Sequence, residues 1–107
     1  MNLVEKRHIF EDLQRYLARA IAETIKTELE ERKINPDLVK DITADLTFRI
    51  TSILDGESEI EIEEGTLKPI ITFQTEEDSL VWNGGASWMH EEVYGWVYDL
   101  FPNKSED

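Results

Sequence analysis

Leu80–Phe101, with the sequence LVWNGGASWMHEEVYGWVYDLF, contains all three tryptophans of the chain and two of its three tyrosines. The largest side chains available for a core are therefore concentrated here. Asn83-Gly84-Gly85 predicts a turn, since glycine reaches positive φ angles without steric cost. Ser87 is the expected N-cap of a following helix, and Pro102 is the expected stop because proline cannot continue a helix. The segment between them is predicted to be a C-terminal aromatic helix.

One side of this helix carries apolar residues at helical spacing. It comprises Met89, Val93, Trp96, Val97 and Leu100. Other aromatic residues lie outside that set, namely Trp88, Tyr94, Tyr98 and Phe101. Two interpretations stay open: the whole helix is the central core element, or its tyrosine side is a protein-binding surface, since tyrosine and tryptophan are enriched at binding hot spots. The segment also alternates as a strand would, but its caps and length favour a helix.

The length and composition predict one globular domain over residues 1–102, followed by a polar tail at 103–107 that is expected to be mobile. The chain has 107 residues and no cysteine, which excludes a disulfide framework. No apolar run approaches the roughly 20 residues needed to span a bilayer. The N-terminus lacks the apolar centre of a signal peptide, so we expect a cytoplasmic protein.

The net charge of −13 is distributed unevenly along the chain. Residues 1–50 carry nine Lys/Arg and ten Asp/Glu, whereas residues 51–107 carry two and fourteen. Direct nucleic-acid binding is disfavoured because phosphate contacts require Lys and Arg. Binding to an anionic membrane is disfavoured for the same reason. A basic protein partner is compatible with the charge, and so is a simple gain in solubility.

The first half of the chain predicts two helices. Apolar residues from Phe10 to Leu29 step by three or four, which indicates one long helix over residues 2–33. Such a helix is expected to project, to pack against a second copy, or to fray at its start. Asn35 and Pro36 are the expected N-cap and first residue of a second helix that ends near Leu54. Residues 42–50 also alternate as a strand would, but this start signal favours a helix.

The second half begins with a change of period from helical to alternating. Residues 59–63 predict a strand, Glu64-Gly65 a hairpin loop, and residues 67–74 the return strand. Residues 80–82 add a short third strand before the aromatic helix. The predicted order is α-α-β-β-(β)-α. Helices separated in this way from a small antiparallel meander indicate an α+β fold.

The sequence contains few candidates for chemistry. The spacing Glu5-x-x-His8 occurs once, whereas a di-iron bundle needs two such motifs. The acidic run after Asp55 lacks the glycine and the final glutamate of an EF-hand loop. We therefore expect no metal, no cofactor and no enzyme activity. The alternative is an enzyme or ligand-binding protein that uses His90, Glu91 and Glu92.

The leading hypothesis is a small, acidic, non-enzymatic module that binds another protein. It would cover a basic surface of that partner, as acidic inhibitors, immunity proteins and DNA mimics cover the basic sites of their targets. Its predicted binding residues are Glu57, Glu59, Glu61, Glu63, Glu64, Trp88, Tyr94, Tyr98 and Phe101. A homodimer without chemistry of its own, formed by the long first helix and the aromatic segment, is the second hypothesis.

Overall fold

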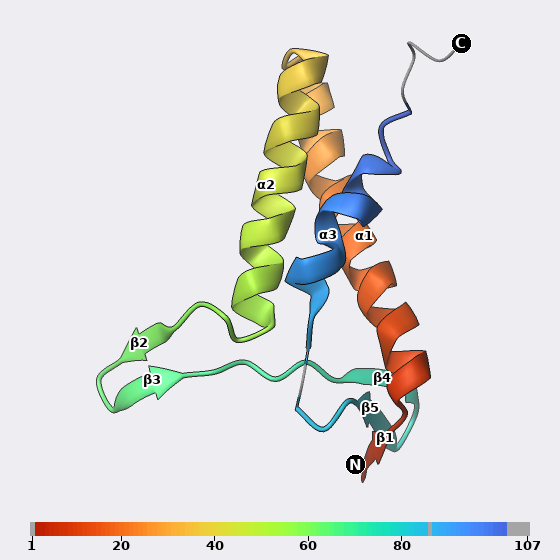
Figure 1. Ribbon diagram of the computed structural model, residues 1–107, viewed down its shortest axis with the longest axis vertical. Coiled ribbons are helices and arrows are strands. Elements are labelled where there is room, and N and C mark those ends of the chain that lie inside the picture. The colour runs from red at the N-terminus through yellow and green to blue at the C-terminus, as the bar shows by residue number, and fades with distance from the viewer. Residues whose placement is uncertain (1, 86, 103–107) are drawn as a thin grey trace.

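The computed structural model describes residues 2–85 and 87–102, and within them the chain forms three helices and two small sheets (Figure 1). The helices are α1 (Arg7–Glu31), α2 (Pro36–Leu54) and α3 (Met89–Tyr98). The strands are β1 (Asn2–Glu5), β2 (Ile60–Ile62), β3 (Gly65–Leu67), β4 (Phe73–Glu76) and β5 (Ser79–Trp82). The predicted α+β class is confirmed, and so is the order of the predicted helices and strands.

The joint between α1 and α2 forms as the sequence predicts. The Asn35 side chain accepts a hydrogen bond of 2.9 Å from the backbone N–H of Asp37, and Pro36 is the first residue of α2. Gly56 follows the helix with a φ of 78°, a left-handed conformation that glycine adopts without strain. Residues 42–50 are helical throughout, so the strand alternative for them is wrong.

The prediction for the first residues of the chain is wrong. Residues 2–5 form β1 rather than the start of a long helix, and β1 pairs in parallel with β5. The reason is the neighbouring strand β5, whose free edge would otherwise be left with unpaired backbone groups. α1 begins only at Arg7, and the first of its fully buried side chains is Phe10.

The single meander predicted for the second half is wrong in its connections. β2 and β3 form a two-stranded antiparallel hairpin by themselves, whereas β4 pairs with β5 in a three-stranded sheet of order β1-β5-β4. The expected return strand over residues 67–74 is interrupted, because Pro69 has no N–H to donate to a ladder. The hairpin loop is Glu63-Glu64, and Gly65 already pairs with Ile62.

The three helices enclose the main core. α3 contributes Met89, Val93 and Val97, which are fully buried as the sequence predicts. α1 and α2 contribute small side chains at their closest approach, namely Ala18, Ala22 and Ala44. Small residues at a helix contact allow the helix axes to come closer together.

α2 buries the side that carries its threonines instead of the side that carries most of its large aliphatic residues. Its fully buried residues include three threonines spaced by four, Thr43, Thr47 and Thr51. Val39 is buried, but four larger aliphatic residues point outward, with 36% to 52% of their surface exposed. These are Leu38, Leu46, Ile50 and Ile53. The threonines fit inside because their side chains are small and a helical threonine can bond to the carbonyl one turn earlier.

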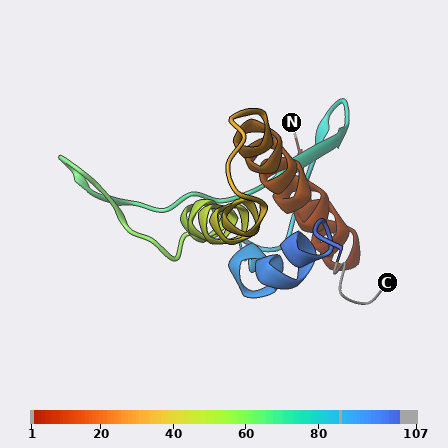
Figure 2. The same cartoon turned by 90° about the horizontal axis from the view of Figure 1, so that it is seen from above.

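The hairpin of β2 and β3 stands away from the rest of the molecule. It leaves the foot of α2 on the side that faces away from α1, which both views show (Figures 1 and 2). The Cα radius of gyration is accordingly 16.0 Å, whereas about 13 Å is typical of a compact domain of this length. No helix in the described part of the chain is long and apolar enough to cross a membrane.

Candidate functional site

The arm, which we define as residues 57–72, has two chemically different faces. In its hairpin, Ile60 pairs with Leu67 and Glu61 pairs with Thr66. Side chains alternate between the faces of a strand, so Ile60, Ile62 and Leu67 share one face and Glu61 lies on the other. Ile62 and Leu67 are 44% and 49% exposed. A lone two-stranded hairpin is only marginally stable in water unless its apolar face packs against another element. No other element of the described chain buries this face.

The five glutamates of the predicted binding surface all lie on the arm. Glu57, Glu59, Glu61, Glu63 and Glu64 are all exposed. Carboxylates this close together raise the local negative potential, which attracts a basic partner and repels an acidic one.

The apolar face of the arm continues onto α2. We call the outward residues of that helix the outer stripe, which consists of Leu38, Ile42, Leu46, Ile50 and Ile53. Where the arm leaves α2, the two elements form a corner that holds a groove of about 460 Å³. The lining residues come from both elements: Phe48, Arg49, Ser52, Ile53, Ser58, Glu59 and Ile60.

The two predicted tyrosines lie along the seam between α3 and α2. The Tyr94 ring packs 5.4 Å from that of Phe48 and 6.0 Å from that of Tyr98, measured between centroids. The Tyr94 hydroxyl donates a 2.8 Å hydrogen bond to Asp45. This hydrogen bond raises the pKa of Tyr94 above its ordinary value of 10.0, and burial and the negative charge of Asp45 act in the same direction.

The other two predicted aromatic residues lie at opposite ends of α3. Trp88 precedes the helix and is half exposed. Phe101 follows it and lines a second groove, of about 570 Å³, between the end of α3 and the α1–α2 joint. The Lys26 ammonium lies 5.1 Å from the Phe101 ring centroid. The predicted binding residues therefore occupy separate places: the arm, the tyrosine seam and the two ends of α3.

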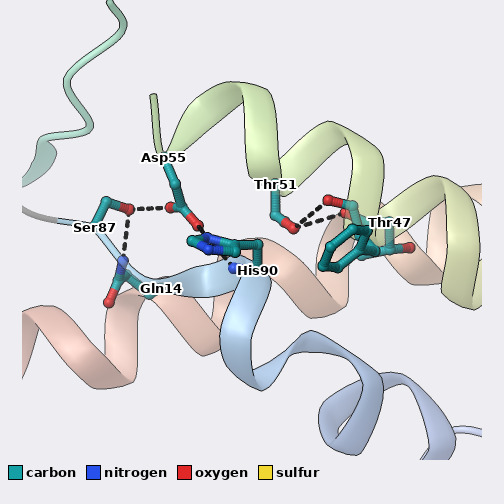
Figure 3. A network of polar contacts seen from close by, with 7 residues as sticks. Gln14, Thr47, Thr51, Asp55, Ser87 and His90 are labelled. Carbon is teal, nitrogen blue, oxygen red and sulfur yellow. Dashed lines mark hydrogen bonds and ion pairs between the residues drawn. The ribbon is translucent and has the colours of Figure 1, made fainter. Parts of the chain in front are cut away.

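Asp55 ties the foot of α2 to the start of α3 (Figure 3). Its side chain is fully buried. One carboxylate oxygen accepts from the Ser87 hydroxyl, which in turn accepts a 2.7 Å hydrogen bond from Gln14 of α1. The other oxygen accepts from the backbone N–H of His90 at 2.7 Å and lies 2.7 Å from the Nδ1 atom of its ring. The network thus fixes three helices at the point where the arm begins.

The predicted N-cap at Ser87 is wrong. The residue that precedes the first turn of α3 is Trp88, and its side chain makes no capping hydrogen bond. Asp55 takes this role from a distant part of the chain, since a carboxylate can accept from the free N–H groups of a helix start and suits its positive dipole. Ser87 supports that carboxylate instead.

Of the three groups considered for catalysis, only His90 is engaged in this network. Glu91 and Glu92 are exposed in the first turn of α3, while the His90 ring contacts Asp55. The Ser87 hydroxyl donates its hydrogen bond to the Asp55 carboxylate. The described residues also contain no group of three His, Cys, Asp or Glu side chains placed to hold a metal ion.

Sequence reasoning missed the outer stripe and Asp55. Large aliphatic residues on a helix usually are buried, so the exposure of this stripe was not expected. The signal that could have corrected this is the row of threonines at positions 43, 47 and 51, a second helical face of α2. Asp55 carried no such signal, because its partners lie more than 30 residues away along the chain.

Comparisons of the chain with protein-family models, with curated proteins and with solved structures found no match.

Proposed function

We propose that the protein is a non-enzymatic binding module that docks onto a basic surface of another protein through the acidic face of its arm. The observation that carries the proposal is the arm itself, a hairpin that leaves the helical body with exposed glutamates and an uncovered apolar face. A segment that contributes little to the core of its own chain is free to serve an interface.

The charge of the arm supports a basic partner. Five glutamates lie between residues 57 and 64, and Lys68 is the nearest basic residue after them in the chain. Opposite charge on a partner would steer the encounter and accelerate association. An acidic inhibitor that covers a basic site is the kind of protein that would use such an arm.

The network around Asp55 supports a binding role over a catalytic one. The carboxylate, the Ser87 hydroxyl and the His90 ring satisfy one another and fix the start of α3 and the foot of α2. Rigid support at the base of a projecting segment lowers the entropy that binding would otherwise cost.

The experiment is an affinity capture from cell extract with the wild-type chain and two charge-matched variants. The first variant carries Glu59→Gln, Glu61→Gln and Glu63→Gln in the arm. The second carries Glu76→Gln, Glu77→Gln and Asp78→Asn at the exposed β4–β5 turn, so that both lose the same charge. We expect the wild type and the turn variant to retain the same basic protein and the arm variant to lose it.

Salt provides the second readout. Because exposed charges are screened within a few ångströms at roughly 0.5 M salt, the captured protein should be released at that concentration. Equal capture by the arm variant and the turn variant would contradict the proposal, because it would assign binding to total charge or to another surface.

A further inference from the structure

We propose that the outer stripe of α2 binds the outer stripe of a second copy of this chain, with the two α2 helices antiparallel across a twofold axis near Leu46. This contact goes beyond the proposed function, since it uses the apolar side of α2 and of the arm, and Glu59 is the one arm glutamate that lines the groove it occupies. The observation behind the proposal is that α2 buries its threonines in the core and leaves the aliphatic residues of the outer stripe outside.

The spacing of the stripe is self-complementary. Ile42 lies four residues before Leu46 and Ile50 four after it, while Leu38 lies eight before and Ile53 seven after. A twofold contact requires the same patch on both subunits, with residue i against j and j against i. Turning α2 end for end about Leu46 sets Ile42 against Ile50 and Leu38 near Ile53, so each aliphatic side chain meets another.

The charges on one flank of the stripe select the antiparallel direction. Asp41, Asp45 and Arg49 are exposed and spaced by four, which places them on one side of the helix. In the antiparallel pair, Arg49 of one copy falls between Asp41 and Asp45 of the other. In a parallel pair, one flank of each helix faces the opposite flank of the other, so Arg49 would not meet the two aspartates of the second copy.

The corner between α2 and the arm accepts the end of the second helix. With the axis at Leu46, Leu38 of one copy reaches the groove lined by Ile53 and Ile60 of the other. Leu38 is 52% exposed within its own chain, so it is free to enter that groove. Each arm then lies beside the start of the partner's α2, which gives its apolar face a cover.

A contact of sufficient area requires both α2 and the arm. A stable interface of standard size buries about 800 Å² per subunit from 20 to 30 residues, more than one stripe of a 19-residue helix supplies. The exposed apolar residues of the arm extend the patch in the same direction. They are Ile62, Leu67 and Ile70.

Cysteine cross-linking tests the register directly, because the chain has no cysteine of its own. Three single variants are compared under mild oxidation at micromolar concentration: Leu46→Cys, Leu38→Cys and Glu23→Cys on the exposed side of α1. Leu46 lies on the proposed axis, where the two Cα atoms can approach to disulfide distance. The two copies of residue 38 would be about 24 Å apart along the axis, given a rise of 1.5 Å per residue.

We expect Leu46→Cys to form a covalent dimer about a hundredfold faster than either of the other two, because the held pair experiences a millimolar effective concentration. Light scattering on the wild type should give the mass of two chains in low salt and in roughly 0.5 M salt, since an apolar contact is not screened. Leu46→Glu should give the mass of one chain with an unchanged helical circular dichroism spectrum.

Three outcomes would overturn the inference: a wild type with the mass of one chain, Leu38→Cys as the fastest to cross-link, or equal rates for all three cysteines. The second of these would indicate a parallel or displaced pair. None of them affects the capture experiment on the arm glutamates, so failure of the two proposals can be told apart.

Discussion

At the scale of the residue, the threonines of α2 show how polar side chains can fill a helix contact. The Thr47 hydroxyl donates to the Thr43 carbonyl at 2.6 Å, and the Thr51 hydroxyl donates to the Thr47 carbonyl at 2.8 Å. Each hydroxyl is thereby satisfied inside its own helix, and its methyl group is left to pack. Thr43 differs, because its hydroxyl oxygen is buried without a hydrogen-bond partner among the described residues.

Thr43→Val should raise the free energy of unfolding by about 1 kcal/mol, since it removes a buried polar group that lacks a partner. Thr47→Val is the matched control, because it removes a hydroxyl that does donate, and it should lower the stability by up to about 1 kcal/mol. Urea unfolding of both variants measures the difference. The opposite ranking would mean that the hydroxyl of Thr43 is satisfied in solution.

Tyr94 should titrate above its ordinary pKa, and Asp45→Asn should bring the pKa down towards that value. A raised pKa means that the folded state holds the phenolic proton more tightly than the unfolded state does. The hydrogen bond to Asp45 therefore contributes stability below pH 10.0, the pKa of the unfolded chain, and this contribution is lost as the pH rises through the folded-state pKa. Ultraviolet titration of the wild type, Asp45→Asn and Tyr94→Phe measures it. A normal Tyr94 pKa in the wild type would show that the hydrogen bond is absent.

At the scale of the element, α2 has two usable faces and the fold buries the less apolar one. The inward face carries the three threonines and Ala44, and the outward face carries the outer stripe. Packing against Ala18 and Ala22 of α1 explains the choice, because close approach of two helices requires small side chains on both.

Neighbouring substitutions on α2 should therefore differ strongly in how much they reduce the stability. Thr47→Glu places a charge in the buried contact and should cost at least about 3 kcal/mol of stability, because an unpaired buried charge is strongly unfavourable. Leu46→Glu changes an exposed residue and should cost about 1 kcal/mol or less when measured at low protein concentration. Urea unfolding measures the loss of stability in each variant. A larger loss for Leu46→Glu than for Thr47→Glu would mean that α2 turns its aliphatic side toward the core.

The elements with local signals could be predicted from the sequence, whereas those set by distant partners could not. Asn35 and Pro36 identify the start of α2, and Met89, Val93 and Val97 identify the buried face of α3, because both patterns lie within a few turns of chain. β1 forms only because β5, nearly 80 residues later, offers it an edge. The division of the strands into two sheets depends likewise on which edges meet in space.

The candidate site was predictable only in part, for the same reason. The glutamates of the arm were identified from their density and alternation in the sequence, and the structure places all of them on its surface. Their use in binding stays a prediction. The outer stripe was missed because periodicity shows that a helix has an apolar face, but not which of two faces meets the core.

At the scale of the whole molecule, the chain combines a helical body with a projecting arm, and its extents are 47 × 35 × 22 Å. The apolar surface left outside runs along α2, through the corner groove and onto the arm. Contiguous surfaces of this kind on a small protein indicate a site of association. The net charge of −13 opposes association of two copies in general, so a specific dimer needs the locally mixed charges beside the stripe.

The proposed contact between two outer stripes is tested most directly by urea unfolding of the wild type and of Leu46→Glu at two protein concentrations a hundredfold apart. If a second chain covers the outer stripe, folding is coupled to association, and the wild-type midpoint must rise with concentration. The midpoint of Leu46→Glu should stay constant. A wild-type midpoint that does not change with concentration would contradict the proposed contact between the two stripes.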